Sequence, residues 1–107
     1  MKKNMSELAE LTIDWAQKRN LIHRDNANKQ MLKVMEEVGE LAAALAKGKE
    51  LETVDAIGDS FVTLIILAAQ LGYDPELCLE AAYNEIANRK GKTVNGVFLK
   101  NDDYERR

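Results

Sequence analysis

Two short segments of the chain are rich in carboxylates, Glu36-Glu37-Val38-Gly39-Glu40 and Asp55-Ala56-Ile57-Gly58-Asp59. On a helix that turns about 100° per residue, the three glutamates fall within a wedge about 100° wide, and the two aspartates fall about 40° apart. Two such helices side by side would offer four or five oxygen ligands to a hard cation. Because no histidine or cysteine lies near these acids, the expected cation is magnesium, with manganese as the alternative.

Asp59 gives a second reason to expect a cation. After Asp59 its helix becomes apolar on almost every side, and an unpaired buried carboxylate must take up a proton or find a positive charge. Ion pairs with Lys33 or Lys47 are the alternative source of that charge. An acidic pair such as Glu36-Glu37 is, on its own, more often a solvated helix face. The two acidic segments together favour metal binding.

Hydrophobic periodicity and helix-end signals predict four helices that would position these acids. Their approximate ranges are 6–19, 28–47, 51–71 and 75–90. Ser6 is the expected N-cap of the first helix, and Gly48 and Gly72 end the second and third. The fourth begins at Asp74-Pro75-Glu76, with cap, proline and acid in their favoured places. In the tail, 91–107, two glycines and a short β-like run predict a loop or hairpin instead of a fifth helix.

The second and third helices both carry a large apolar face. The apolar stripe of the second helix is expected to lie opposite its carboxylates, and it consists of Met31, Val34, Met35, Val38, Leu41, Ala42 and Leu45. The third helix is apolar almost all round after Asp59, so it should be covered on two sides. A chain of this length builds one core. We therefore expect a partner subunit to bury the second face of the third helix. This expectation also fits Ala43 and Ala44 on the carboxylate side of the second helix.

Composition limits the class of protein. With 107 residues, 46% hydrophobic and 31% charged, the chain is expected to be one compact domain, 1–107. A net charge of −3 argues against nucleic acid as a partner. No apolar run approaches the roughly 20 residues needed to span a membrane, and acids interrupt any leader-like start. Cys78, the only cysteine, is expected to be a buried packing thiol in a reduced, cytoplasmic protein.

The paired acidic segments resemble the signature of the MazG-like nucleotide pyrophosphohydrolases, E-E-x-x-E followed by E-x-x-D. That family is related to the all-α dimeric dUTPases and to phosphoribosyl-ATP pyrophosphohydrolase. The chain is also similar to the compact, phage-type branch of the family in three further segments: Trp15-Ala16, Arg19-Asn20-Leu21-Ile22, and residues 84–92 running into Asn95-Gly96-Val97-Phe98. The resemblance therefore covers nearly the whole chain, from about Leu8 to Lys100.

The resemblance implies an all-α, four-helix, MazG-like bundle that assembles as a homodimer or homotetramer. It also implies hydrolysis of a (d)NTP between the α and β phosphates, giving the (d)NMP and pyrophosphate. Carried over by position, the metal ligands would be Glu37, Glu40 and Asp59. Glu36 would assist them as a ligand or by orienting the attacking water.

One departure from the family pattern falls in the second acidic segment. The first acidic position of that half is Ala56, which cannot ligate a metal, while Asp55 stands one residue earlier. Around the helix, Asp55 lies about 40° from Asp59, and position 56 lies about 60° away on the other side. We expect Asp55 to bind the same metal from a different angle, or through a water.

The remaining expected roles concern proton transfer, phosphates and the base. Glu36, or Glu37 where the metal does not fully engage it, is the expected general base. The residues expected to hold phosphate charge are Lys33, Arg89, Lys90 and Lys92. The residues that could contact the nucleoside are Trp15, Asn84 and Asn95. For Trp15 a core or interface position is the alternative, and His23 is expected to be a surface residue without a partner.

Three alternatives remain open at the level of sequence. Ala56, together with the second apolar face of the third helix, suggests a catalytically weak magnesium-binding module that acts by association. A purely structural four-helix protein with solvated acids is another. Within the enzyme class, hydrolysis of phosphoribosyl-ATP is an alternative substrate choice.

Overall fold

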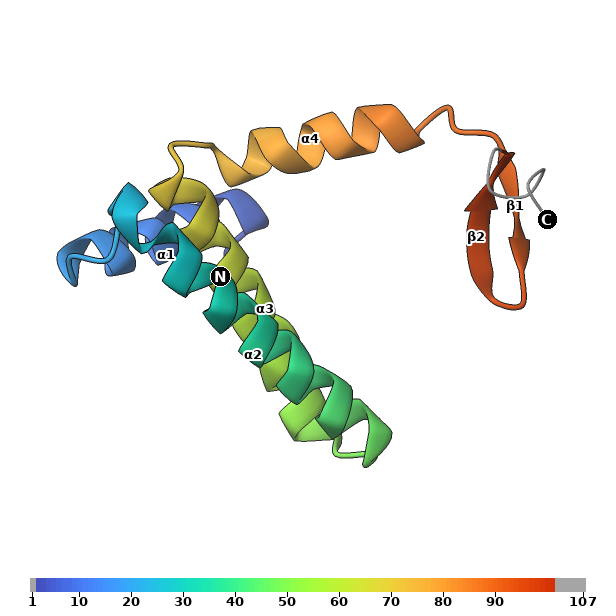
Figure 1. Cartoon of the computed structure of the whole chain (residues 1–107), viewed down its shortest axis with the longest axis horizontal. Coiled ribbons are helices and arrows are strands. Elements are labelled where there is room, and N and C mark those ends of the chain that lie inside the picture. The colour runs from blue at the N-terminus through green and yellow to red at the C-terminus, as the bar shows by residue number, and fades with distance from the viewer. Residues whose placement is uncertain (1, 102–107) are drawn as a thin grey trace. The chain divides into compact units, whose positions relative to one another are not determined.

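The structure is a computed structural model that describes residues 2–101. In this part of the chain there are four α-helices and a small antiparallel sheet (Figure 1). The elements are, in chain order, α1 (Met5–Lys18), the 3-10 helix η1 (Arg24–Asn26), α2 (Ala27–Ala46), α3 (Glu50–Gln70), α4 (Pro75–Ile86), β1 (Gly91–Val94) and β2 (Val97–Lys100). The chain divides within α4, between Leu77 and Cys78, into two compact units, each of which is described by itself.

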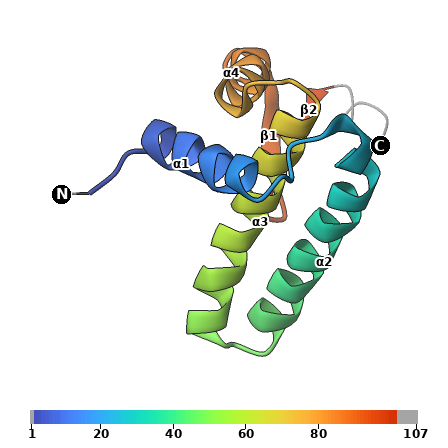
Figure 2. The same cartoon turned by 90° about the vertical axis from the view of Figure 1, so that its left-hand side faces the viewer.

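In the first unit, α2 and α3 lie side by side as a helical hairpin, and α1 packs against α3 (Figure 2). The hairpin turns at Gly48, whose φ of 68° is the left-handed conformation that glycine adopts without strain. The backbone N–H of Lys49 then donates to the carbonyl of Ala44 at 3.0 Å, which satisfies one of the last carbonyls of α2. This short turn fixes α2 and α3 as neighbours.

Side chains also hold the connection between α1 and α2 against the end of α3. The buried Gln70 donates from Nε2 to the carbonyl of Leu21 at 2.9 Å. The guanidinium of Arg24 donates to the carbonyl of Leu71 at 3.1 Å. These bonds satisfy loop and helix-end carbonyls that have few backbone partners, and they fix how α1 enters α2.

The interior of the first unit is built from small residues. Its buried hydrophobic side chains are Ala9, Ala16, Val34, Ala44, Ala56 and Ile66. Among residues 2–101 no large side chain is fully buried, whereas Leu32, Leu51 and Val54 are 71%, 87% and 70% exposed. The small side chains let α2 and α3 approach closely, but they leave much apolar surface on this unit facing outward.

The side of α2 that faces α3 differs from the sequence prediction. It carries the buried and half-buried residues Gln30, Val34, Glu37, Leu41 and Ala44. Five residues of the predicted apolar stripe are exposed instead: Met31, Met35, Val38, Ala42 and Leu45. The prediction that the carboxylates lie opposite the packed face is therefore wrong for Glu37. Periodicity locates an apolar face, but it does not say whether the same chain covers that face.

The second unit contains the rest of α4 and a β-hairpin, which confirms the hairpin prediction for the tail. β1 pairs with β2 so that Gly91 lies opposite Lys100 and Val94 opposite Val97. Asn95 and Gly96 form the two-residue turn with φ of 53° and 79°, as a type I′ hairpin turn requires. A Cβ at Gly91 would collide with the carbonyl of Leu99. Residues 102–107 of the predicted tail lie outside the described residues.

Two details of the helices correct the sequence predictions. The N-cap of α1 is Asn4, whose side chain accepts from the N–H of Glu7 at 2.8 Å, while Ser6 donates to Glu76 at 2.5 Å. Asparagine and serine are equally good caps, so residue type alone did not choose between them. Cys78 is exposed, not buried. Within the described residues of its unit, the elements besides α4 are the two strands of the hairpin.

Three further predictions concern the end of α4, the helix bundle and membrane-spanning helices. α4 ends at Ile86, short of the predicted position 90. That the four helices form one bundle in a single domain stays a prediction. Among the described residues, no single helix is long and apolar enough to cross a membrane; only α3 and α4 taken together as a bent pair pass that test of length and composition.

Candidate functional site

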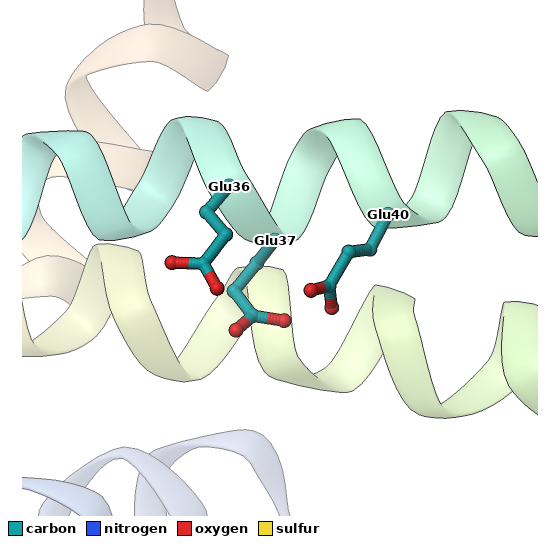
Figure 3. Close-up of side chains that lie close together, drawn as sticks. All are labelled: Glu36, Glu37 and Glu40. Carbon is teal, nitrogen blue, oxygen red and sulfur yellow. The ribbon is translucent and has the colours of Figure 1, made fainter.

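The three glutamates of α2 converge. Glu36, Glu37 and Glu40 each offer a carboxylate oxygen, and these oxygens lie within 4.8 Å of one another (Figure 3). The helix alone produces this arrangement, because Glu40 follows Glu36 by four residues and Glu37 by three, so both lie beside it on the helix surface. An all-oxygen set of this size would suit a hard divalent cation. That the cluster binds one stays a prediction.

Glu37 is the most enclosed of the three. Its side chain is 12% exposed, against 53% for Glu36. Burial raises the pKa of Glu37, and the negative charges of Glu40 and Asp59 raise it further. The ionised form is therefore disfavoured unless positive charge is nearby. The negative charge of the cluster exceeds the positive charge near it. A bound cation would reduce this excess.

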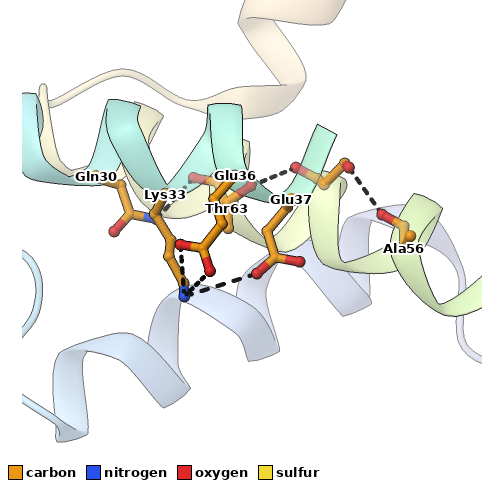
Figure 4. A network of polar contacts seen from close by, with 7 residues as sticks. Gln30, Lys33, Glu36, Glu37, Ala56 and Thr63 are labelled. Carbon is orange, nitrogen blue, oxygen red and sulfur yellow. Dashed lines mark hydrogen bonds and ion pairs between the residues drawn. The ribbon is translucent and has the colours of Figure 1, made fainter. Parts of the chain in front are cut away.

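Lys33 supplies part of that charge. Its ammonium lies 3.3 Å from Glu36 and 3.8 Å from Glu37 (Figure 4). The hydrogen bond with Glu36 raises the pKa of Lys33, and the charges of the three glutamates add to the shift. Lys33 was predicted to hold a substrate phosphate, and here it pairs with the acids, as the ion-pair alternative anticipated.

The two aspartates of the acidic segment on α3 have different environments. Asp59 is half-buried, and its charge acts on Glu37 across the two helices. Asp55 is exposed, while Ala56 between them is buried and 6% exposed. The position where the family pattern has an acid is therefore in the interior of the first unit, whereas Asp55 reaches the site from its open side.

A chain of polar contacts joins α2 to α3 beside the acids (Figure 4). Gln30 donates to the carbonyl of Thr63 at 3.1 Å, and the Thr63 hydroxyl donates to the carbonyl of Ser60 at 2.9 Å. The Ser60 hydroxyl in turn donates to the carbonyl of Ala56 at 2.8 Å. The first of these bonds crosses from α2 to α3 and ties the two helices together beside the acids, and the other two lie within α3.

A pocket of about 330 Å³ adjoins the carboxylates in the first unit. Its lining residues are Glu40, Ala43, Ala44, Lys47, Glu52, Asp55, Ala56 and Asp59. Sequence reasoning considered Lys47 only as an ion-pair partner and did not consider Glu52. The available signal was spacing, because Lys47 follows Glu40 by seven residues and so lies on nearly the same face of α2.

The predicted phosphate and nucleoside residues of the C-terminal part lie in the second unit. Arg89 and Lys90 share a pocket of about 470 Å³, and Arg89 pairs with Glu85 at 3.3 Å. The pocket is completed by Asn88, Lys100 and Asn101. Lys92 is on β1 and does not line this pocket.

The two predicted asparagines have different settings. Asn84 is exposed on α4. Asn95 has a positive φ in the hairpin turn, which gives a structural reason for an asparagine there.

Trp15 and His23 lie in the N-terminal part of the first unit. Trp15 is 47% exposed on α1, and the guanidinium carbon of Arg19 lies 4.2 Å from the centre of its ring. One face of the indole is thus occupied by a cation. His23 is a surface residue as predicted, but it has a partner, because its Nε2 lies 2.6 Å from the side-chain oxygen of Asn20.

Comparison with known proteins gives two matches. The family described as phosphoribosyl-ATP pyrophosphohydrolase matches residues 5–86, which include α1 to α4 and both acidic segments. An uncharacterized 18.2 kDa protein from the rep-hol intergenic region of Haemophilus phage HP1 is 40% identical over 74 residues. That stretch is 69% of this chain and 45% of the phage protein, so the chain matches less than half of its relative's length. No solved structure matches.

Proposed function

The chain belongs to the phosphoribosyl-ATP pyrophosphohydrolase family, and we therefore propose that it hydrolyses a nucleoside triphosphate between the α and β phosphates. The products are the monophosphate and pyrophosphate. One observation carries the proposal: the carboxylate oxygens of Glu36, Glu37 and Glu40 lie within 4.8 Å of one another. A polyanionic substrate cannot approach such a cluster unless a cation lies between them, so the acids and the substrate class imply a metal ion.

Magnesium, or manganese in its place, fits the donor set. Glu37 and Glu40 would hold it from α2, and Asp59 and Asp55 from α3. When bound, such a cation neutralises phosphate oxygens and lowers the pKa of a water molecule so that it can attack. The raised pKa of Glu37, caused by burial and by its acidic neighbours, supports a site that takes up positive charge.

The chain's own groups then have distinct tasks. Glu36 is the most accessible acid for proton transfer, because its side chain is 53% exposed and it belongs to the same cluster. It accepts the proton of the attacking water. Lys33 is released from the acids when a cation binds them, and its ammonium then contacts a substrate phosphate. Glu37 is the general base if the metal leaves one of its oxygens free.

Residues of the second unit and of α1 complete the substrate assignment. Arg89, Lys90 and Lys92 provide positive charge for the phosphates. Trp15 offers its open ring face to a base, and Asn84 and Asn95 offer amide groups to the base or the sugar.

We also propose that the chain works as a homodimer or homotetramer. The supporting observation is the exposed apolar surface of α2 and α3, on which Met35, Val38 and Phe61 are 60%, 44% and 52% exposed. Apolar surface of this extent is unusual on a monomer. Sedimentation of the wild type beside Val38→Asp tests this: the wild type should sediment as a dimer or tetramer and the variant as a smaller species, and a monomeric wild type would overturn it.

Two competing functions each rest on a specific observation. Hydrolysis of phosphoribosyl-ATP is the activity for which the matching family is named. A magnesium-binding module without turnover follows from the buried alanine at position 56, where the family pattern has an acid.

The test is release of pyrophosphate and monophosphate from a panel of NTPs, dNTPs and phosphoribosyl-ATP, with magnesium or manganese. Wild type should turn over at least one substrate, and Asp59→Asn should lose roughly 100-fold or more if it removes a ligand of the reacting centre. Asp14→Asn, an exposed acid paired with Lys18, is the matched control and should stay within about twofold. Turnover only of phosphoribosyl-ATP would select that substrate. If no substrate is hydrolysed while magnesium still raises the melting temperature, the result would favour the magnesium-binding module without turnover.

A further inference from the structure

We infer that Lys47 is a further substrate-binding residue, whose ammonium holds the terminal phosphate of the triphosphate. The inference rests on the proposed function. Lys47 is the C-cap residue of α2 and lines the same pocket as Glu40, Asp55 and Asp59. It is the one basic residue in that lining. The lining therefore combines four carboxylates with one ammonium, which stands at the C-terminal end of α2.

Lys47 differs from its basic neighbours because, among the described residues, no acid forms an ion pair with its side chain. Lys33 pairs with Glu36 at 3.3 Å, and Lys49 pairs with Glu52 at 3.8 Å. Within residues 2–101, no ion pair or hydrogen bond engages the side chain of Lys47, although three acids line its pocket besides Glu40. An ammonium on a flexible stem that lacks a fixed partner can turn toward an incoming phosphate without first breaking an ion pair.

The spacing along α2 suits a chain of phosphates. Seven residues separate Glu40 from Lys47, which corresponds to about 10 Å along the helix at about 1.5 Å per residue. The two residues lie on nearly the same face, because seven residues make almost two full turns. A triphosphate that starts at the carboxylate cluster can thus extend along α2 toward Lys47.

Small side chains line the stretch of the pocket between Glu40 and Lys47. Ala43 and Ala44 follow Glu40 on α2, and Ala56 lines the pocket from α3. An acid at position 56, as in the family pattern, would add a negative charge beside this stretch. Alanine removes that charge, and Lys47 adds a positive one. Both features make the pocket less negative, which favours the binding of an anion.

This placement predicts that Lys47 distinguishes three phosphates from two. A ligand too short to reach Lys47 gains little from its ammonium. A ligand with a third phosphate gains a charge-assisted contact. Lys47 acts by binding and positioning, and takes no part in proton transfer.

The test uses calorimetry with two inorganic probes, tripolyphosphate and pyrophosphate, in magnesium. Lys47→Gln should weaken tripolyphosphate binding by roughly tenfold or more, and pyrophosphate binding by less than about threefold, since it removes one charge-assisted contact. Lys47→Arg should restore most of the affinity. Lys49→Gln is the matched control and should stay within about twofold of wild type, because Lys49 does not line the pocket.

The outcomes distinguish the binding role of Lys47 from the proposed hydrolysis. If Lys47→Gln and Lys49→Gln weaken tripolyphosphate equally, or if wild type does not bind tripolyphosphate, the role of Lys47 is wrong. If wild type binds tripolyphosphate through Lys47 but hydrolyses no nucleotide, the proposed function fails while the binding role stands. Magnesium should raise the melting temperature of Lys47→Gln as much as that of wild type, which shows that the variant keeps its fold and its acids.

Discussion

The two acidic segments have similar spacing but different outcomes. On α2, the oxygens of Glu36, Glu37 and Glu40 converge within 4.8 Å. On α3, Asp59 is half-buried, while Asp55 is exposed. The first arrangement needs only a regular helix, whereas the second depends on how α3 is rotated against α2. Helical spacing therefore determines which acids share a face, and packing determines which of them reach the same site.

The largest effect is expected when an acid of α2 is replaced. Glu40 belongs both to the glutamate cluster and to the lining of the adjoining pocket. Glu40→Gln should lower turnover by roughly 100-fold or more and abolish the rise in melting temperature with magnesium, because it removes a charged ligand. Steady-state kinetics and thermal denaturation measure the two effects. A variant that keeps the magnesium effect would place the metal elsewhere.

On the α3 side we expect a smaller effect. Asp55→Asn should lower turnover by roughly tenfold and weaken magnesium binding, because the exposed Asp55 contributes from the edge of the site or through a water. Magnesium titration and kinetics on the same preparation test this. If both quantities stay at the wild-type value, Asp55 does not replace the acid missing at Ala56.

Loss of the hydrogen bond between α2 and α3 should have a smaller effect still. Gln30 donates to the carbonyl of Thr63 and so helps to fix α2 against α3. Gln30→Met should cost about 1 kcal/mol in the free energy of unfolding, since it removes one partly buried hydrogen bond and keeps the volume. Gln17→Met on the exposed side of α1 is the control, and it should change stability by less than about 0.5 kcal/mol. Equal losses in the two variants would show that the bond does not fix the helices.

The smallest expected effect concerns the charge of Glu37 in metal-free protein. Burial and acidic neighbours raise the pKa of Glu37 in the folded state. The ionised group therefore costs stability above its folded pKa, and this cost disappears as the pH falls through that pKa. In EDTA, Glu37→Gln should have a higher melting temperature than wild type at pH 7. The difference should vanish below the ordinary glutamate pKa of about 4.3.

The sequence predicted the helices and the convergence of the glutamates because both depend on local spacing. Residues such as Leu41 and Gly48 set the period and the turn, and the structure keeps them in those roles. The rotation of α2 was not predictable, since Met35 and Val38 are as apolar as Val34 but are exposed. The position of Lys47 was missed for a related reason, because a pocket between two helices is not encoded in either helix alone.

The glycine turn at Gly48 has a consequence for folding. It joins α2 directly to α3, so all the candidate metal ligands, from Glu36 to Asp59, belong to one helical hairpin. Closing a short loop costs little chain entropy, and contacts between residues close in sequence form quickly. The ligands can therefore meet as soon as α2 and α3 dock, before α1 or the C-terminal hairpin is in place. A cation present at that moment would stabilise the docked pair and speed the folding of the chain.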